Sequence, residues 1–141
     1  HFIHRSIRIC TKPQTGGIGV RETQAPGAAG VACTLLAGER LLLLARLMRS
    51  CFRFHDQLYR FGGEEFVVLL PTTTLEGAII LAENLRQAVE QAQILDQHPI
   101  SISIGLSVVQ VTDSDAQTAM RRADQHLYQA KAQGRNRVVA L

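Results

Sequence analysis

The chain has 141 residues, of which 46% are apolar, and a formal net charge of +3. This length and apolar content suit one domain with a single core. The sequence has no apolar run of about 18 residues and no basic stretch followed by a long apolar one, so we expect no membrane span, no signal peptide and a cytoplasmic location. Three cysteines without CxxC or His-paired spacing argue against a zinc site and a disulfide framework.

The charge is unevenly placed along the chain. Residues 1–61 carry nine Lys or Arg against three Asp or Glu, whereas residues 62–141 carry six against nine. A basic half can attract nucleotides or nucleic acid. Because few aromatic residues accompany the arginines, we interpret the imbalance as a solvated arginine face and predict no nucleic-acid partner.

The first half of the chain yields one helix and one hairpin. Residues 1–37 lack both strand alternation and a sustained helical stripe, except at Phe2–Ile9, so no structure is predicted beyond that stretch. Apolar residues at helical spacing predict an amphipathic helix over Glu39–Phe52. Two apolar arms, Gln57–Phe61 and Phe66–Leu70, predict a hairpin around Gly62-Gly63.

The second half alternates helices and strands. Thr73-x-x-Glu76 is a capping-box pattern that opens a helix, and Ser114-x-x-Gln117 is a second one, opening a helix that ends at Gly134. Between them, isoleucine and leucine alternate with serine and glycine over residues 100–107, which predicts a strand with one apolar face. Arg137–Leu141 is a last short strand. The order of elements predicts an α/β (α+β) fold in which helices pack on an antiparallel-containing sheet.

The hairpin tip carries the clearest chemical signal. Gly62 and Gly63 have no side chains, so a nucleotide could lie against the backbone, and Glu64 offers the hard oxygen that Mg²⁺ prefers. This pattern indicates a nucleotide–metal site. The alternative is an ordinary hairpin with solvated carboxylates.

A longer set of motifs surrounds the hairpin. Arg53-Phe54-His55-Asp56 and Arg60 precede Gly62-Gly63-Glu64-Glu65-Phe66, and residues 123–138, Ala-Asp-Gln-His-Leu-Tyr-Gln-Ala-Lys-Ala-Gln-Gly-Arg-Asn-Arg-Val, follow it. Together they resemble the GGDEF family of diguanylate cyclases, from about Gly38 to Leu141. The resemblance implies a nucleotidyl-cyclase-like fold on a ferredoxin-like core. It divides the chain into an atypical segment, 1–37, part of the domain or appended to it, and a GGDEF domain, 38–141.

The resemblance also implies an activity, in which a homodimer condenses two GTP into cyclic di-GMP with Mg²⁺ or Mn²⁺. Glu64 would bind the metal and help to deprotonate the ribose 3′-hydroxyl, and Glu65 would support the site. Gly62 and Gly63 would let the nucleotide approach the backbone.

Two cations complete the implied substrate site. Lys131 and Arg135 match the residues that bind the triphosphate in the family. The alternative for both is a favourable charge at a helix C-terminus.

An inhibitory site for the product is implied by Arg53-x-x-Asp56. An arginine fork suits phosphate and guanine edges, and a carboxylate can accept from guanine N–H groups. The further arginine of that site corresponds to Asn84 here, with Arg86 nearby. The alternative is a surface ion pair.

The first 37 residues depart from the family. The motifs Asp-x-Asp-x-Phe-Lys, Asn-Asp and Gly-His-x-x-Gly-Asp are absent, apart from a final Gly-Asp that survives as Gly38-Glu39 and makes Glu39 a candidate for substrate binding. Counting back from the hairpin places the first metal ligand near Glu22 and the guanine-binding residue near Gly30. Divergence, fusion to foreign sequence and a reading-frame error upstream of about Ala45 each fit this departure.

Two functions therefore stay open. One is an active diguanylate cyclase with product inhibition, and the other is a catalytically impaired module that binds GTP or cyclic di-GMP. An acid beside Glu64, Glu22 or another, would favour the first.

Overall fold

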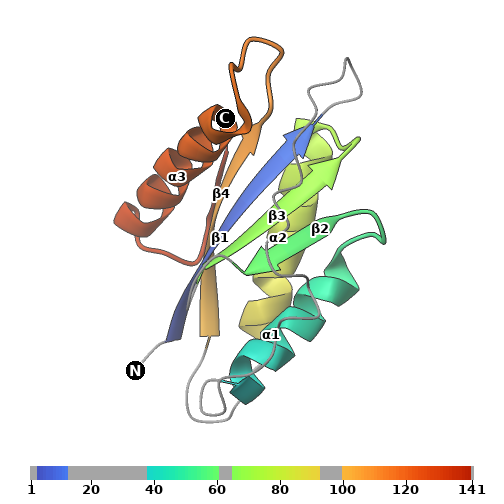
Figure 1. The fold of residues 1–141 in the computed structure, drawn as a ribbon. Helices are drawn as coiled ribbons and strands as arrows, with labels where there is room; N and C mark the ends of the chain where they lie inside the picture. The colour runs from blue at the N-terminus through green and yellow to red at the C-terminus, as the bar shows by residue number, and fades with distance from the viewer. Residues whose placement is uncertain (1–2, 13–37, 61–64, 93–99, 141) are drawn as a thin grey trace.

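The computed structural model describes residues 3–12, 38–60, 65–92 and 100–140 (Figure 1). Their elements are, in chain order, β1 (Ile3–Lys12), α1 (Gly38–Cys51), β2 (Gln57–Arg60), β3 (Glu65–Pro71), α2 (Leu75–Gln91), β4 (Ile100–Val108), α3 (Ala116–Ala132) and β5 (Val138–Ala140). None of the helices in these ranges has the length and apolar character that crossing a membrane requires.

Five strands form one sheet in the order β2-β3-β1-β4-β5. β2 and β3 make the expected antiparallel hairpin, in which Arg60 pairs with Phe66. β1 lies in the centre and runs parallel to both β3 and β4, and β5 runs parallel to β4. The predicted mixed α/β fold with helices on a sheet is confirmed, but its central strand extends beyond the stretch for which the sequence predicts any structure.

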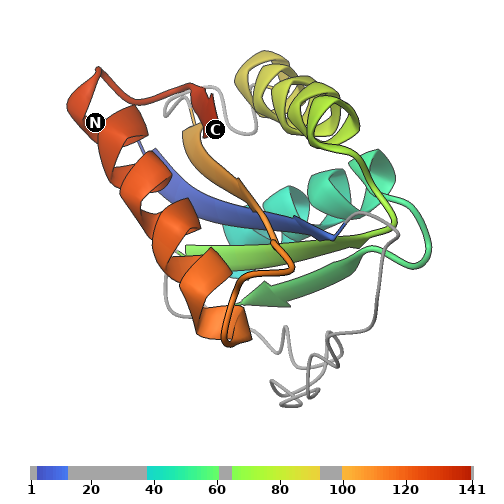
Figure 2. The same ribbon diagram turned by 90° about the horizontal axis from the view of Figure 1, so that it is seen from above.

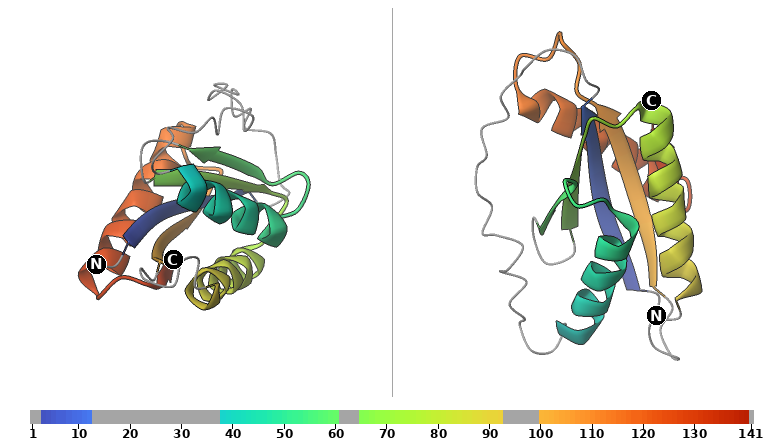
Figure 3. Two further views of the ribbon diagram at one scale, coloured as in Figure 1. Left: turned by 90° about the horizontal axis from the view of Figure 1, so that it is seen from below. Right: turned by 90° about the vertical axis from the view of Figure 1, so that its right-hand side faces the viewer.

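The helices cover both faces of the sheet. α1 and α2 lie on one face and α3 on the other (Figures 2 and 3). The main core lies on the α1/α2 side, where alternate residues of β1, β3 and β4 are fully buried against both helices: Ile7, Ile9, Phe66, Val68, Leu70, Ile102, Ile104 and Leu106. The strand period of two therefore selects the residues that face this core.

The opposite face of β4 is made of small residues that are also buried. Ser103 and Ser107 are completely buried, and the Ser107 hydroxyl donates to the Ala119 carbonyl at 2.7 Å. Gly105 lies directly under α3, since a Cβ atom there would be 2.1 Å from the Ala123 carbonyl oxygen. The alternation predicted for this strand is confirmed, and its polar face is buried because α3 packs closely on it.

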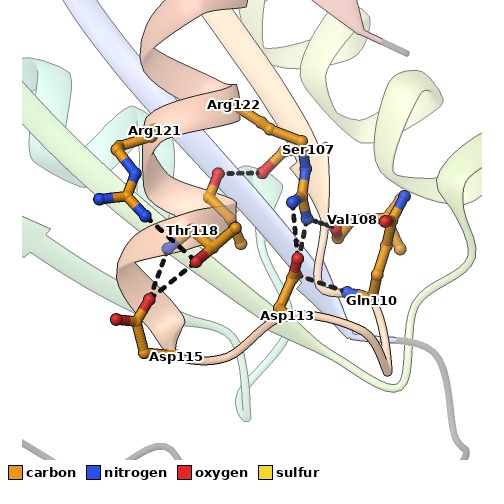
Figure 4. A network of polar contacts seen from close by, with 9 residues as sticks. Ser107, Val108, Gln110, Asp113, Asp115, Thr118, Arg121 and Arg122 are labelled. Carbon is orange, nitrogen blue, oxygen red and sulfur yellow. Dashed lines mark hydrogen bonds and ion pairs between the residues drawn. The ribbon is translucent and has the colours of Figure 1, made fainter.

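Both helix caps lie one residue later than the capping-box patterns predict. Thr74 is the N-cap of α2, and its hydroxyl accepts from the Gly77 amide at 3.1 Å. Asp115 is the N-cap of α3, and its carboxylate accepts from the Thr118 amide at 2.9 Å (Figure 4). The prediction of Thr73 and Ser114 as N-caps is wrong, because α2 begins at Leu75 and α3 at Ala116, and the N-cap is the residue just before the first helical one. Thr73 instead donates to the Pro71 carbonyl.

An ion pair fixes the loop between β4 and α3. Arg122 donates to both carboxylate oxygens of Asp113 at 2.7 Å and to the Val108 carbonyl at 2.6 Å (Figure 4). Asp113 also accepts from the Gln110 amide at 2.8 Å. The hydrogen bond from Arg122 is the main cause that lowers the pKa of Asp113 to about 2. The loop therefore starts α3 at a fixed place over the sheet.

Candidate active site

The hairpin brings the motif to the start of β3. β2 ends at Arg60 and β3 begins at Glu65, so the connection between them is four residues long. Gly62, Gly63 and Glu64 lie in that connection, outside the described residues. Glu22, in the range 13–37, is also outside the described residues. Glu65 is the first motif residue whose surroundings the structure describes.

Glu65 faces an arginine from the central strand. The Arg8 guanidinium donates to Glu65 at 3.4 Å and, from Nε, to Asp124 of α3. The side chains of Glu65 and Asp124 are 42% and 50% exposed, but that of Arg8 is only 14% exposed. Arg8 thus links β1, β3 and α3 through one buried cation.

Two opposing effects act on the protonation of Arg8. Burial disfavours the charged form, but the hydrogen bond and charge of Asp124, together with Glu65, outweigh it and raise the pKa of Arg8. The Nη1 atom of Arg8 is buried and has no hydrogen-bond partner within the described part of the chain. Arg8 lies within Phe2–Ile9, the one stretch of the first 37 residues with a predicted pattern, but no motif there indicates its contacts with Glu65 and Asp124.

Carboxylates at the end of the sheet where β3 begins suit a magnesium ion, which keeps several waters and binds one or two protein carboxylates. Glu65 offers a half-exposed oxygen pair there, next in sequence to Glu64. Within the described ranges, no group of three or more His, Cys, Asp or Glu side chains is placed to hold a metal ion. The chemistry of the donors fits the predicted ion, and a ligand set would need Glu64.

The two predicted triphosphate residues lie at the end of α3. Lys131 is in the last turn of the helix and is partly buried, and Arg135 is exposed in the following turn. The Arg135 amide donates to the Ala130 carbonyl at 2.9 Å and the Gly134 amide to Lys131 at 3.3 Å, which is the Schellman pattern. Lys131 and Arg135 are thus carried by one helix end.

The predicted inhibitory motif contains a buried carboxylate. Asp56 is only 3% exposed, and its carboxylate accepts from the Arg53 amide at 2.7 Å. The Arg53 side chain is 53% exposed and donates to the Thr73 hydroxyl at 2.9 Å. Arg53 Nε also lies 4.0 Å from Asp56, so the ion pair of the alternative is present, but its carboxylate partner is buried and closes the loop between α1 and β2. Of Arg53 and Asp56, only Arg53 has a half-exposed side chain.

The structure does not bring Arg86 to this motif. Arg53 contacts Thr73, just before α2, whereas Arg86 lies about 17 Å along the helix axis from the first residue of α2. Arg86 binds Glu83 and Glu90 instead. Glu39 lies in the first turn of α1, and its side chain is outside the described part of the structure.

Comparison with known proteins identifies the family. The family described as "Diguanylate cyclase, GGDEF domain" matches residues 35–137. The chain belongs to this family. Residues 3–12, which supply the central strand of this GGDEF domain, lie outside the match. The domain division predicted at residue 38 is close to the start of the match and stays a proposal.

Individual relatives agree with this assignment. The diguanylate cyclase DgcM of Escherichia coli K12 is 43% identical over 102 residues, which are 72% of this chain and 25% of the relative. The response regulator PleD of Caulobacter vibrioides is 38% identical over 109 residues, 74% of this chain and 24% of the relative. This GGDEF domain thus spans about a quarter of the length of these curated relatives.

Solved structures share the fold. The active GGEEF domain of a diguanylate cyclase from Vibrio cholerae is 39% identical, with a TM-score of 0.67 over 71% of this chain and 65% of that one. The diguanylate cyclase SiaD from Pseudomonas aeruginosa, in complex with its activator SiaC, is 33% identical, with a TM-score of 0.58 over 74% of this chain and 41% of that one. The predicted nucleotidyl-cyclase-like fold is confirmed.

Proposed function

We propose that this GGDEF domain is a diguanylate cyclase that condenses two GTP molecules into cyclic di-GMP. Each ribose 3′-oxygen attacks the α-phosphate of the opposite GTP, the bond to the β-phosphate breaks, and two pyrophosphates leave. Family membership carries this proposal, because the matched region includes both the GGEEF hairpin and the helix end with Lys131 and Arg135.

The residues divide the work of phosphoryl transfer, which depends on positioning and on neutralising phosphate charge. Glu64 would hold Mg²⁺ or Mn²⁺ and accept the proton of the 3′-hydroxyl, and Gly62 and Gly63 would admit the nucleotide. Lys131 and Arg135 would bind the triphosphate. The metal, when bound, polarises the phosphate and neutralises its charge.

Glu65 and Glu39 have supporting roles in this proposal. Glu65 supports Glu64, and its own charge is partly neutralised by Arg8. Glu39, at the start of α1, is proposed to contact the nucleotide. A homodimer is required, because each domain holds one GTP and the reaction joins two.

Product inhibition is a further part of the proposal. Arg53, with a half-exposed guanidinium, is the residue best placed to bind a phosphate or guanine edge of cyclic di-GMP. Asp56 would act by fixing the backbone of Arg53, since its carboxylate is buried against the Arg53 amide. Arg86 would join only if the ligand reached along α2.

The test is to incubate the purified chain with GTP and Mg²⁺ and to detect cyclic di-GMP by chromatography. The variant Glu64→Gln removes one charge with little change in volume, so we expect a folded protein without turnover. Activity of this variant within a few-fold of the parent would refute the role of Glu64.

A second candidate function is a module that binds GTP or cyclic di-GMP without turning GTP over. The observation that favours it is Arg8, a fixed cation that neutralises Glu65 from a strand outside the family match. Titration of GTP and of cyclic di-GMP against the chain separates the two: binding of either ligand without formation of product supports the module.

A further inference from the structure

The turn after α3 has an unusual backbone. Three consecutive residues have positive φ: Gly134 at 117°, Arg135 at 64° and Asn136 at 46°. Glycine adopts such angles freely, but a residue with a Cβ atom does so at a cost in free energy, which is smaller for asparagine than for arginine. Surrounding contacts must therefore hold this turn.

The helix end explains only part of the turn. The Schellman hydrogen bonds to Ala130 and Lys131 fix the amides of Gly134 and Arg135. Beyond them, the Arg137 carbonyl accepts from the Ile104 amide at 2.9 Å, where the chain joins the sheet. The backbone of Asn136 lies between these two anchors.

Helix α2 holds the side chain of Asn136. Arg86 donates to the Asn136 amide oxygen at 3.2 Å, and the Asn136 amide nitrogen donates to Glu90 at 3.2 Å. Arg86 also donates to Glu90 at 2.9 Å and to both oxygens of Glu83 at 3.1 and 3.2 Å. Arg86, Glu90 and Asn136 thus form a closed triangle of hydrogen bonds, which we call the α2 clamp.

The clamp differs from an ordinary pair on a helix surface. The Arg86 side chain is only 16% exposed, and its bonds to Glu83 and then Glu90 raise its pKa despite the burial. Its contact with Asn136 joins two elements that are 50 residues apart in sequence. The oxygen and the nitrogen of the Asn136 side-chain amide both form hydrogen bonds, so the clamp fixes the orientation of this side chain as well as its distance from α2.

We propose that Arg86 and Glu90 are positioning residues for Arg135: by holding Asn136 in the left-handed conformation, they fix the direction in which Arg135 leaves the turn. The proposal rests on the proposed triphosphate role of Arg135. It gives Arg86 a role in the substrate site in place of the inhibitory site. Without the clamp, Arg135 would sample other directions, and its contact with triphosphate would carry an ordering cost.

A structural measurement tests the clamp without any nucleotide. Amide hydrogen exchange is followed in the parent, in Arg86→Gln and Asn136→Ala, and in Gln87→Ala, an exposed neighbour of Arg86 on α2, as the control. We expect the Arg135 amide to exchange about tenfold faster or more in the first two variants, while the amides in the middle of α3 keep their protection. Equal exchange at Arg135 in Arg86→Gln and the control would overturn the clamp.

A double-mutant cycle tests its effect on the substrate site. Affinity for GTP, and for tripolyphosphate as a probe of the phosphates alone, is measured in Arg86→Gln, in Arg135→Ala and in the combination. We expect Arg86→Gln to weaken binding about three- to tenfold in the parent and to have no further effect once Arg135 is absent. A purely structural role would give equal losses in both backgrounds and refute the inference.

The two failures can be told apart. Unchanged affinity in Arg135→Ala would refute the triphosphate role of Arg135, and the positioning role with it. A loss in Arg135→Ala that simply adds to the loss in Arg86→Gln would refute the positioning role alone. Both variants must retain the parent's circular dichroism spectrum, and Arg86→Lys, which keeps the charge but not the fork, is expected to restore only part of the affinity.

Discussion

Replacing Gly105 with alanine should separate α3 from the sheet. The added Cβ would be 2.1 Å from the Ala123 carbonyl oxygen, 2.4 Å from the Leu127 amide nitrogen and 2.7 Å from the Leu127 Cβ, although such contacts do not occur below 3.0 Å. Since two of these three atoms are backbone, no rotamer change relieves the clash, and α3 must withdraw by about 1 Å. Overpacking typically costs about 1–3 kcal/mol, and we expect about 3 kcal/mol or more here.

Urea unfolding followed by circular dichroism gives the free energy of unfolding for the parent and Gly105→Ala. Gly77→Ala is the matched control, because a Cβ there would be 3.2 Å from the Thr74 hydroxyl, a contact that a shift of a few tenths of an ångström relieves, and alanine favours a helix over glycine by about 1 kcal/mol. We expect the control to stay within about 1 kcal/mol of the parent. A loss below about 1 kcal/mol in Gly105→Ala would show that α3 does not pack this closely.

Further predictions concern the ion pairs of Asp113 and Arg8 and the proposed inhibitory motif. The lowered pKa of Asp113 means that its ionised form stabilises the fold above about pH 4 and that this contribution is lost as the pH falls toward 2. In urea titrations, the difference in unfolding free energy between the parent and Asp113→Asn should therefore shrink from about pH 4 to pH 2. A difference that stays constant over this range would contradict the prediction. Arg8→Met should lower the free energy of unfolding by about 1–2 kcal/mol, because it leaves the half-exposed carboxylates without their cation and water screens their charge only in part. Adding Glu65→Gln to Arg8→Met should restore part of this loss, and an unchanged stability of Arg8→Met would argue against the ion pairs. Arg53→Ala should weaken cyclic di-GMP binding about tenfold in isothermal titration, with little change in the free energy of unfolding. Asp56→Ala should instead lower the free energy of unfolding by about 1–3 kcal/mol, because it removes a buried hydrogen bond. Equal affinity for cyclic di-GMP in Arg53→Ala and the parent would place the ligand elsewhere.

The sequence predicts the local elements from periodicity but not the environment of every face. β4 alternates isoleucine with serine and glycine, and that pattern alone is typical of a strand with one solvent-exposed side. The structure buries Ser103 and Ser107 because small residues let a helix lie directly on the strand. Likewise, Thr73 and Thr74 have the same side chain and could each serve as an N-cap. Which of them caps α2 depends on where β3 ends and the helix begins, and the sequence pattern does not give that position.

The candidate site is predictable where residue motifs carry it. Lys131 and Arg135 follow from the pattern at the end of α3, and the structure carries both on that helix end. Arg8 and the α2 clamp could not be found, since each depends on contacts between elements far apart in the chain. The side chain of Asp56 illustrates the same limit, because the motif gives its identity but not its burial.

The position of β1 has a consequence for how the chain folds. Of the five described strands, β1 comes first in the sequence and lies in the middle of the sheet, and its two neighbours, β3 and β4, follow much later in the chain. Such non-local pairing closes large loops before it gains contacts, which slows folding. During translation, β1 has no partner strand until β3 and β4 have been synthesised. The edge of β3 that pairs with β1 stays open until β1 docks. The period of greatest vulnerability to aggregation is therefore the interval before β1 enters the sheet.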